Sequence, residues 1–121
     1  MGAGRTGCCF SKSGGVRRRT VKTEYIFERN QDEQELRRLR MIEEALDPTT
    51  IAHLQRTEIG ARWCCLELGA GAGSIMKWLG SVVGDKGHVV GVDKNTNYLH
   101  DLPEPPCQIV EDDFLEVSLD A

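Results

Sequence analysis

Apolar and polar positions alternate with a helical period in the first third of the chain. Residues 32–47 carry apolar side chains at steps of three and four, the spacing of one helix face. These are Leu36, Leu39, Ile42 and Leu46. Asp47-Pro48 predicts the end of this helix, because a proline disfavours the helical conformation of the residue before it. Pro48 can also begin a second helix that runs to Arg56.

Beyond Arg62 the pattern changes to short apolar runs. The runs at 62–68, 88–93 and 107–114 are typical of strands buried on both faces of a parallel sheet. Between them, residues 74–84 carry apolar side chains on one helical side, and residues 95–102 predict a short helix. The alternation of strands and helices predicts an α/β fold with right-handed crossovers.

The length of 121 residues suits one small domain or part of a larger one. Glycine, serine and arginine dominate residues 1–23, which predicts a disordered leader. We expect an N-terminal helical segment at 24–60 and the sheet at 61–121. Met1-Gly2 with Thr6 fits an N-acylation pattern. That pattern is short and common in glycine-rich leaders, so no membrane anchoring is expected.

Charge and cysteine spacing exclude several classes of protein. The net charge is -4 and the pI about 5.4, so no nucleic-acid partner is expected. No window approaches the roughly 20 apolar residues of a transmembrane helix, and there is no secretory apolar segment. The five cysteines contain no C-x-x-C spacing, which argues against a zinc site. A cytoplasmic location and no metal are therefore expected.

Alternating glycines follow the first apolar run. Gly69, Gly71 and Gly73 come directly after Glu67 and precede the predicted helix at Ser74. A dinucleotide fingerprint would need a third glycine where Ser74 stands, and Glu67 would repel a pyrophosphate. A carboxylate beside a helix N-terminus instead suits a ligand with an ammonium and a carboxylate on one carbon. That is the amino-acid end of S-adenosylmethionine. A glycine-rich turn used only for packing is the alternative.

Acidic residues also end the second and third predicted strands. Asp93 can accept hydrogen bonds from two ribose hydroxyls, in S-adenosylmethionine or in a nicotinamide cofactor. Asp112 and Asp113 can accept from an adenine amino group. Because the carboxyl ends of parallel strands meet at one edge of the sheet, Glu67 and these acids are predicted to line one crevice.

These elements together resemble class I S-adenosylmethionine-dependent methyltransferases. The segment E-L-G-A-G-A-G at 67–73 resembles their motif I, V-V-G-V-D-K-N at 89–95 their ribose-binding segment, and V-E-D-D-F at 110–114 their adenine-binding segment. The resemblance covers roughly residues 24–117. It implies a Rossmann-like sheet with strand order 3-2-1 and crossover helices, and a bound S-adenosylmethionine. The cofactor-binding residues that it implies are Glu67, Gly69, Ala70, Gly71, Gly73, Asp93, Lys94, Asp112 and Asp113.

The resemblance also implies methyl transfer to a small molecule. The family's sheet has seven strands, of which this chain supplies three. The fourth strand and its loop usually carry substrate and catalytic groups, so no catalytic residue is assigned, and the truncated chain alone is expected to be inactive. The alternative is a non-catalytic nucleotide-binding or interaction module. A nicotinamide-dependent oxidoreductase is disfavoured by Glu67 and Ser74. With no fourth strand beside it, the first strand is predicted to be an exposed edge that promotes self-association.

Overall fold

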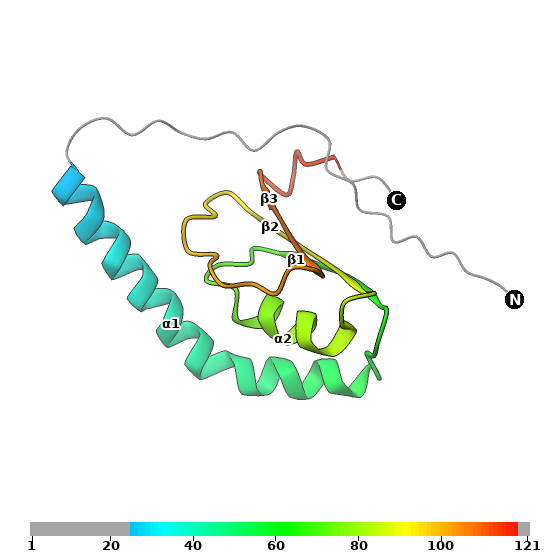
Figure 1. Ribbon diagram of the computed structural model, residues 1–121. Helices are drawn as coiled ribbons and strands as arrows, with labels where there is room; N and C mark the ends of the chain where they lie inside the picture. Colours follow the sequence, from blue (N-terminus) through cyan, green and yellow to red (C-terminus); the bar gives the residue numbers. More distant parts are fainter. Residues whose placement is uncertain (1–24, 119–121) are drawn as a thin grey trace, which may run out of the picture.

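The computed structural model describes residues 25–118, with side chains from residue 28 onward. The predicted leader at 1–23 lies outside the described residues. These residues form an α/β fold of two helices and one sheet (Figure 1). Within the described part, no helix is both long and apolar enough to cross a bilayer. The elements are α1 (Tyr25–Arg56), β1 (Cys64–Leu68), α2 (Ser74–Val83), β2 (His88–Asp93) and β3 (Cys107–Glu111).

The sheet has three parallel strands in the order β1-β2-β3. All three strands begin and end within a few residues of the predicted runs, so these predictions are confirmed. Leu68 pairs with Val92, and Asp93 pairs with Glu111. The carboxyl ends of the strands therefore meet at one edge of the sheet, as the sequence predicts.

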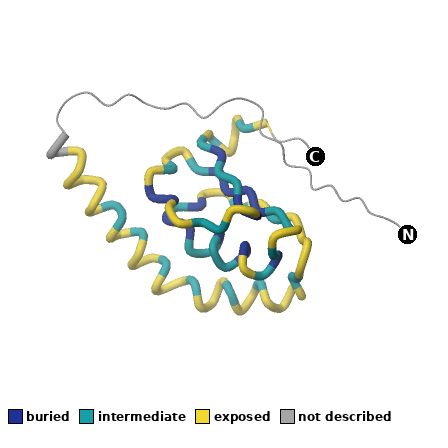
Figure 2. Tube along the Cα trace, viewed as in Figure 1, coloured by how far each residue is buried: buried dark blue, intermediate teal, exposed yellow. Residues whose placement is uncertain are grey.

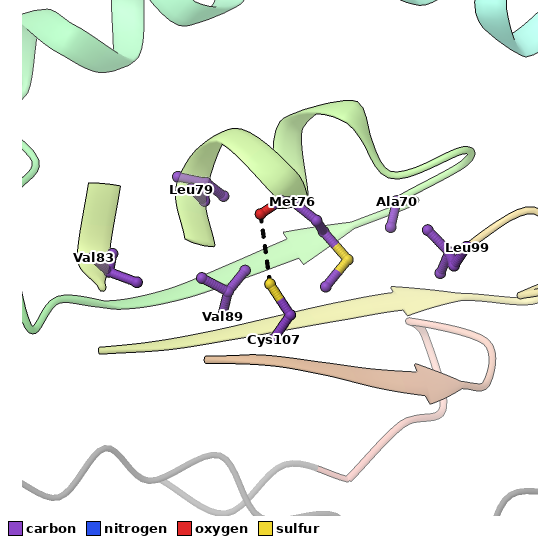
Figure 3. Packing of buried hydrophobic residues seen from close by; sticks show 7 residues of the cluster. All are labelled: Ala70, Met76, Leu79, Val83, Val89, Leu99 and Cys107. Carbon is purple, nitrogen blue, oxygen red and sulfur yellow. Dashed lines mark hydrogen bonds between the residues drawn. The ribbon is translucent and has the colours of Figure 1, made fainter. Parts of the chain in front are cut away.

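Helix α2 covers one face of the sheet and forms the main core with it. Its buried side chains Met76, Leu79 and Val83 pack against Val89 of β2 and Cys107 of β3 (Figure 3). The Cys107 thiol donates a hydrogen bond to the Met76 carbonyl, with Sγ and O 3.6 Å apart. Burial raises the pKa of this thiol to about 11, so Cys107 is a packing residue.

Helix α1 is continuous, and the predicted break at Asp47-Pro48 is wrong. Pro48 lies inside the helix, which changes direction part-way along its length (Figure 1). A proline removes one helical hydrogen bond and bends the helix, but packing on both sides can keep it helical. On the C-terminal side, Leu54 packs against the main core. The two predicted N-terminal helices are therefore one.

The connection from β2 to β3 contains no helix, so the helix predicted at 95–102 is also wrong. Short helices are marginal, and local side-chain bonds compete with them here. Asp93 Oδ1 accepts from the Asn95 amide at 3.0 Å, and Asn95 Oδ1 accepts from the Asn97 amide at 3.0 Å. Leu99 and Leu102 nevertheless pack against the α2 core, as a crossover helix would.

The layers are unequal in burial. Helix α2 lies between the sheet and the C-terminal part of α1 (Figure 1). Many of the buried positions lie in β2, β3 and α2, whereas β1 has none and α1 is mostly exposed (Figure 2). On the other sheet face, Val90, Val92 and Val110 are buried and Val117 packs against them. On β1, the side chains Leu66 and Leu68 remain exposed.

Gly91 allows α2 to lie close to the sheet. A Cβ there would overlap with Met76 Sδ, and Met76 is fully buried. We expect Gly91→Ala to lower the free energy of unfolding by about 1–3 kcal/mol through overpacking. Urea denaturation measures this. The substitution Met76→Val removes the clashing atoms. It should therefore lower the free energy of unfolding less in the Gly91→Ala background than in the wild type. Strictly additive effects would contradict the account.

The exposed edge of β1 generates the second prediction. Strand β1 ends the sheet, and Leu66 and Leu68 lie exposed on it. We expect the chain to self-associate through this strand, because unpaired edge groups and apolar side chains recruit another strand. Light scattering after size-exclusion chromatography should show oligomers that Leu66→Lys/Leu68→Lys reduces. Leu115→Lys is the control, since Leu115 is exposed outside the sheet. A monomeric wild type would refute the prediction.

Candidate functional site

The loop from β1 to α2 has a backbone that requires glycine. Gly69, Gly71 and Gly73 have φ angles of 76°, 60° and 88°, in the left-handed region. The amides of Gly69 and Ala70 donate to the Val92 carbonyl at 2.7 and 3.3 Å. The loop is thereby tied to β2 at the carboxyl edge of the sheet.

Different neighbours surround the three glycines. A Cβ at Gly73 would lie 2.9 Å from Leu99, and one at Gly71 would lie 3.6 Å from Leu39 of α1. A Cβ at Gly69 would meet nothing within 4 Å. Side chains of this chain therefore approach two of the glycines, and the loop is open to a ligand at Gly69.

Glu67 lies at the end of β1 with its side chain toward the α2 side of the sheet, the side of Cys65. Its oxygen Oε2 is enclosed and has no hydrogen-bond partner among the described residues. Burial raises the pKa of Glu67 to about 7, and the negative charges of Asp47, Glu43 and Asp93 add to the rise. The carboxyl group therefore sits in a site that favours either a proton or a cationic ligand.

Two acids from α1 complete this cluster, and sequence reasoning missed both. It assigned Ile42 and Leu46 to the inner face, but they are 41% and 57% exposed. Glu43 and Asp47 lie inward in their place. The sequence spacing could have revealed them, because Glu43 and Asp47 continue the steps of three and four residues along the inward face of α1. The partly buried residues of this face are Leu36, Leu39, Glu43, Asp47, Ile51 and Leu54.

The N-terminus of α2 is occupied by a carboxylate of α1. Glu43 Oε2 accepts a hydrogen bond from the Ser74 amide at 3.1 Å. The preceding residue, Gly73, has no side chain that could cap the helix. The other Glu43 oxygen pairs with Arg40 Nη1 at 3.0 Å. The preference of this helix end for an anion, which the sequence predicts, is thus met from within the chain.

Asp93 is held in a fixed orientation beside the loop. Its Oδ2 accepts from the Gly71 amide at 2.8 Å, and its Oδ1 accepts from the Asn95 amide at 3.0 Å. Each carboxylate oxygen can accept a further hydrogen bond. Asp93 can therefore accept hydrogen bonds from two further donors.

The remaining predicted residues lie at the ends of β2 and β3. Lys94 Nζ is 3.1 Å from Asp113 Oδ2, and Asp113 Oδ1 accepts from the Leu115 amide at 2.9 Å. The Leu115 amide and Lys94 both lower the pKa of Asp113. Asp112 Oδ1 accepts from the Asp113 amide at 2.8 Å. Asp112 and Asp113 thus shape the turn after β3, and Lys94 joins the two loops.

The charges of Glu43, Asp47 and Asp93 all act on Glu67, and we call this group of four carboxyl groups the acidic crevice, after the crevice that the sequence predicts. Its residues come from three elements, α1, β1 and β2. No group of three His, Cys, Asp or Glu side chains within residues 25–118 is arranged to hold a metal ion. Chemically, the crevice can accept hydrogen bonds from a cationic N–H group and from hydroxyls.

Comparisons with known proteins place the chain in no family. No protein-family model, curated protein or solved structure gives a significant match. The geometry of the acidic crevice and the glycine loop is therefore the basis for any function.

The raised pKa of Glu67 gives the third prediction. Between about pH 4.5 and 7 the folded chain keeps a proton on Glu67 that the unfolded chain has released. Stability from this group is therefore complete below pH 4.5 and is lost as the pH rises to 7. The expected loss is on the order of 2–3 kcal/mol. Glu67→Gln should remove this fall and be more stable than the wild type at pH 8.

Urea denaturation from pH 4.5 to 8 tests this prediction. Glu44→Gln is the matched control, because Glu44 is an exposed glutamate of α1. It should keep the wild-type pH dependence. An unchanged slope in Glu67→Gln would show that Glu67 titrates normally.

Proposed function

We propose that the chain is the cofactor-binding part of an S-adenosylmethionine-dependent methyltransferase that acts on a small molecule. The observation that carries the proposal is the enclosed oxygen of Glu67, which has no hydrogen-bond partner and belongs to the residue two positions before Gly69, where the glycine loop is open. A buried carboxylate without a partner is costly, and an ammonium group in contact with it would remove that cost. The three-stranded parallel sheet is compatible with a Rossmann-like fragment.

Each part of the crevice would serve a part of the cofactor. Glu67 would accept hydrogen bonds from the ammonium group, which would lower its pKa and keep it ionised. Asp93, fixed by two amides, would accept from the ribose hydroxyls. Asp112 or Asp113 at the end of β3 would lie toward the adenine, with Lys94 paired to Asp113.

S-adenosylmethionine supplies an activated methyl group on its sulfonium. The residues of this chain would bind and orient the cofactor, so that the methyl carbon stands in line with an acceptor. Methyl transfer depends strongly on such placement. We assign no residue of this chain to the acceptor.

The charge of the crevice argues against a nicotinamide cofactor. A pyrophosphate at the glycine loop would lie beside Glu67, Asp47 and Glu43, and the repulsion would be strong at this partly buried position. The α2 N-terminus, which would receive a phosphate, already carries the Glu43 carboxylate. The same carboxylates attract a cation.

Calorimetric titration tests the proposal. S-adenosylhomocysteine and S-adenosylmethionine should bind, and NAD should bind more weakly or not at all. Asp93→Asn should weaken binding by about 1–3 kcal/mol, the contribution of hydrogen bonds to a charged group. Asp85→Asn is the control, since Asp85 is exposed in the turn before β2. Tighter binding of NAD, or an unchanged affinity in Asp93→Asn, would contradict the proposal.

A further inference from the structure

The contact between Glu43 and α2 joins residues that are 31 positions apart. The first amides of a helix have no partner within the helix, and here the Ser74 amide is satisfied by the Glu43 carboxylate. Only 16% of the Glu43 side chain is exposed. The contact therefore places a carboxylate at this helix end, and another anion would have to compete with it for the Ser74 amide.

The proposed cofactor needs the same position. Its amino-acid end carries an ammonium for Glu67 and, on the same carbon, a carboxylate for the α2 N-terminus. Two carboxylates at one helix end would repel each other, and Ser74 offers one amide proton. We infer that Glu43 is a built-in competitor of the cofactor: its carboxylate occupies the carboxylate subsite and must leave before the ligand's carboxylate binds. This inference rests on the proposed function.

The surroundings of Glu43 favour its release without loss of the fold. The charge of Glu43 opposes the ionisation of Glu67, and Asp47 lies four residues further along α1, where like charges disfavour each other. Arg40, whose side chain is 50% exposed, already pairs with the other Glu43 oxygen at 3.0 Å and offers a partner toward solvent.

Helix α1 is anchored over the site by other contacts. Tyr98 donates a hydrogen bond to Asp32 Oδ1 at 3.0 Å, and Leu39 lies near Gly71. The side chain of Glu43 can therefore move while α1 stays in place.

The competition has a signature that a cap with only a structural role would lack. Removing Glu43 frees the subsite for a carboxylate, but it also removes a negative charge that attracts the ammonium. A ligand with both groups should gain affinity. Decarboxylated S-adenosylmethionine, which keeps the ammonium and lacks the carboxylate, should gain none.

Calorimetric titration of the full chain provides the test. Glu43→Ala should bind S-adenosylhomocysteine about tenfold more tightly than the wild type, which corresponds to about 1.4 kcal/mol. Its affinity for decarboxylated S-adenosylmethionine should be unchanged or lower. Glu44→Ala, with the same charge change one position along the helix, should bind both ligands like the wild type. Glu43→Gln, which keeps an acceptor but loses the charge, provides a second variant if Glu43→Ala does not fold.

Inorganic sulfate provides an arm that does not depend on the cofactor. Sulfate should shift the amide NMR signals of Ser74 and Ile75 in the Glu43 variant and leave them unchanged in the wild type. If sulfate shifts these signals only in the Glu43 variant, and no S-adenosyl ligand binds any variant, then Glu43 does compete with anions for the α2 N-terminus but the proposed function is wrong. Equal affinities of the wild type and Glu43→Ala for S-adenosylhomocysteine would overturn the inference and leave the proposed function intact. Equal sulfate responses would also overturn the inference.

Discussion

The partly buried carboxyl group of Glu67 at the end of β1 is the constraint on which the site depends. Glu67 has an enclosed oxygen without a hydrogen bond, and α1 places Glu43 and Asp47 near it. A protein interior rarely keeps such charges together without a counter-charge, because desolvation disfavours each of them. The repulsion between these carboxylates is relieved either by a proton on Glu67 or by a cation in the crevice. The proposed cofactor site corresponds to the second case, in which the ammonium group of the cofactor is the cation.

The close packing of α2 on the sheet fixes the geometry of this site. Gly91 lets Met76 approach β2, and the same approach sets where α2 begins. The glycine loop must then turn from β1 to Ser74 in a left-handed backbone conformation. The position of the α2 N-terminus, and so of the Ser74 amide, is a consequence of core packing rather than of the loop alone.

Helix α1 contributes two acids to the crevice, and one of them, Glu43, is the proposed competitor of the cofactor. It reaches Tyr98 through Asp32, Gly71 through Leu39 and Ser74 through Glu43. At Asp32 and Glu43, a helix that only covered the core would present apolar side chains instead. The two inward acids, Glu43 and Asp47, instead add negative charge to the crevice. The proposed cofactor site and its proposed competitor therefore both depend on the position of α1.

The sequence by itself determined the three strands, the helix at α2, and the placement of Glu67 and Asp93 at one edge of the sheet. These features depend on local periodicity and on the rule that parallel strands end together. Only the tertiary structure decided that α1 continues through Pro48, that the β2–β3 connection is not helical, and that Glu43 and Asp47 face inward. The physical reason is that each of these three features depends on contacts between segments that are distant in the sequence. Such contacts can outweigh the helix-breaking tendency of a proline, a weak helical pattern, or the preference for burying the apolar face of a helix.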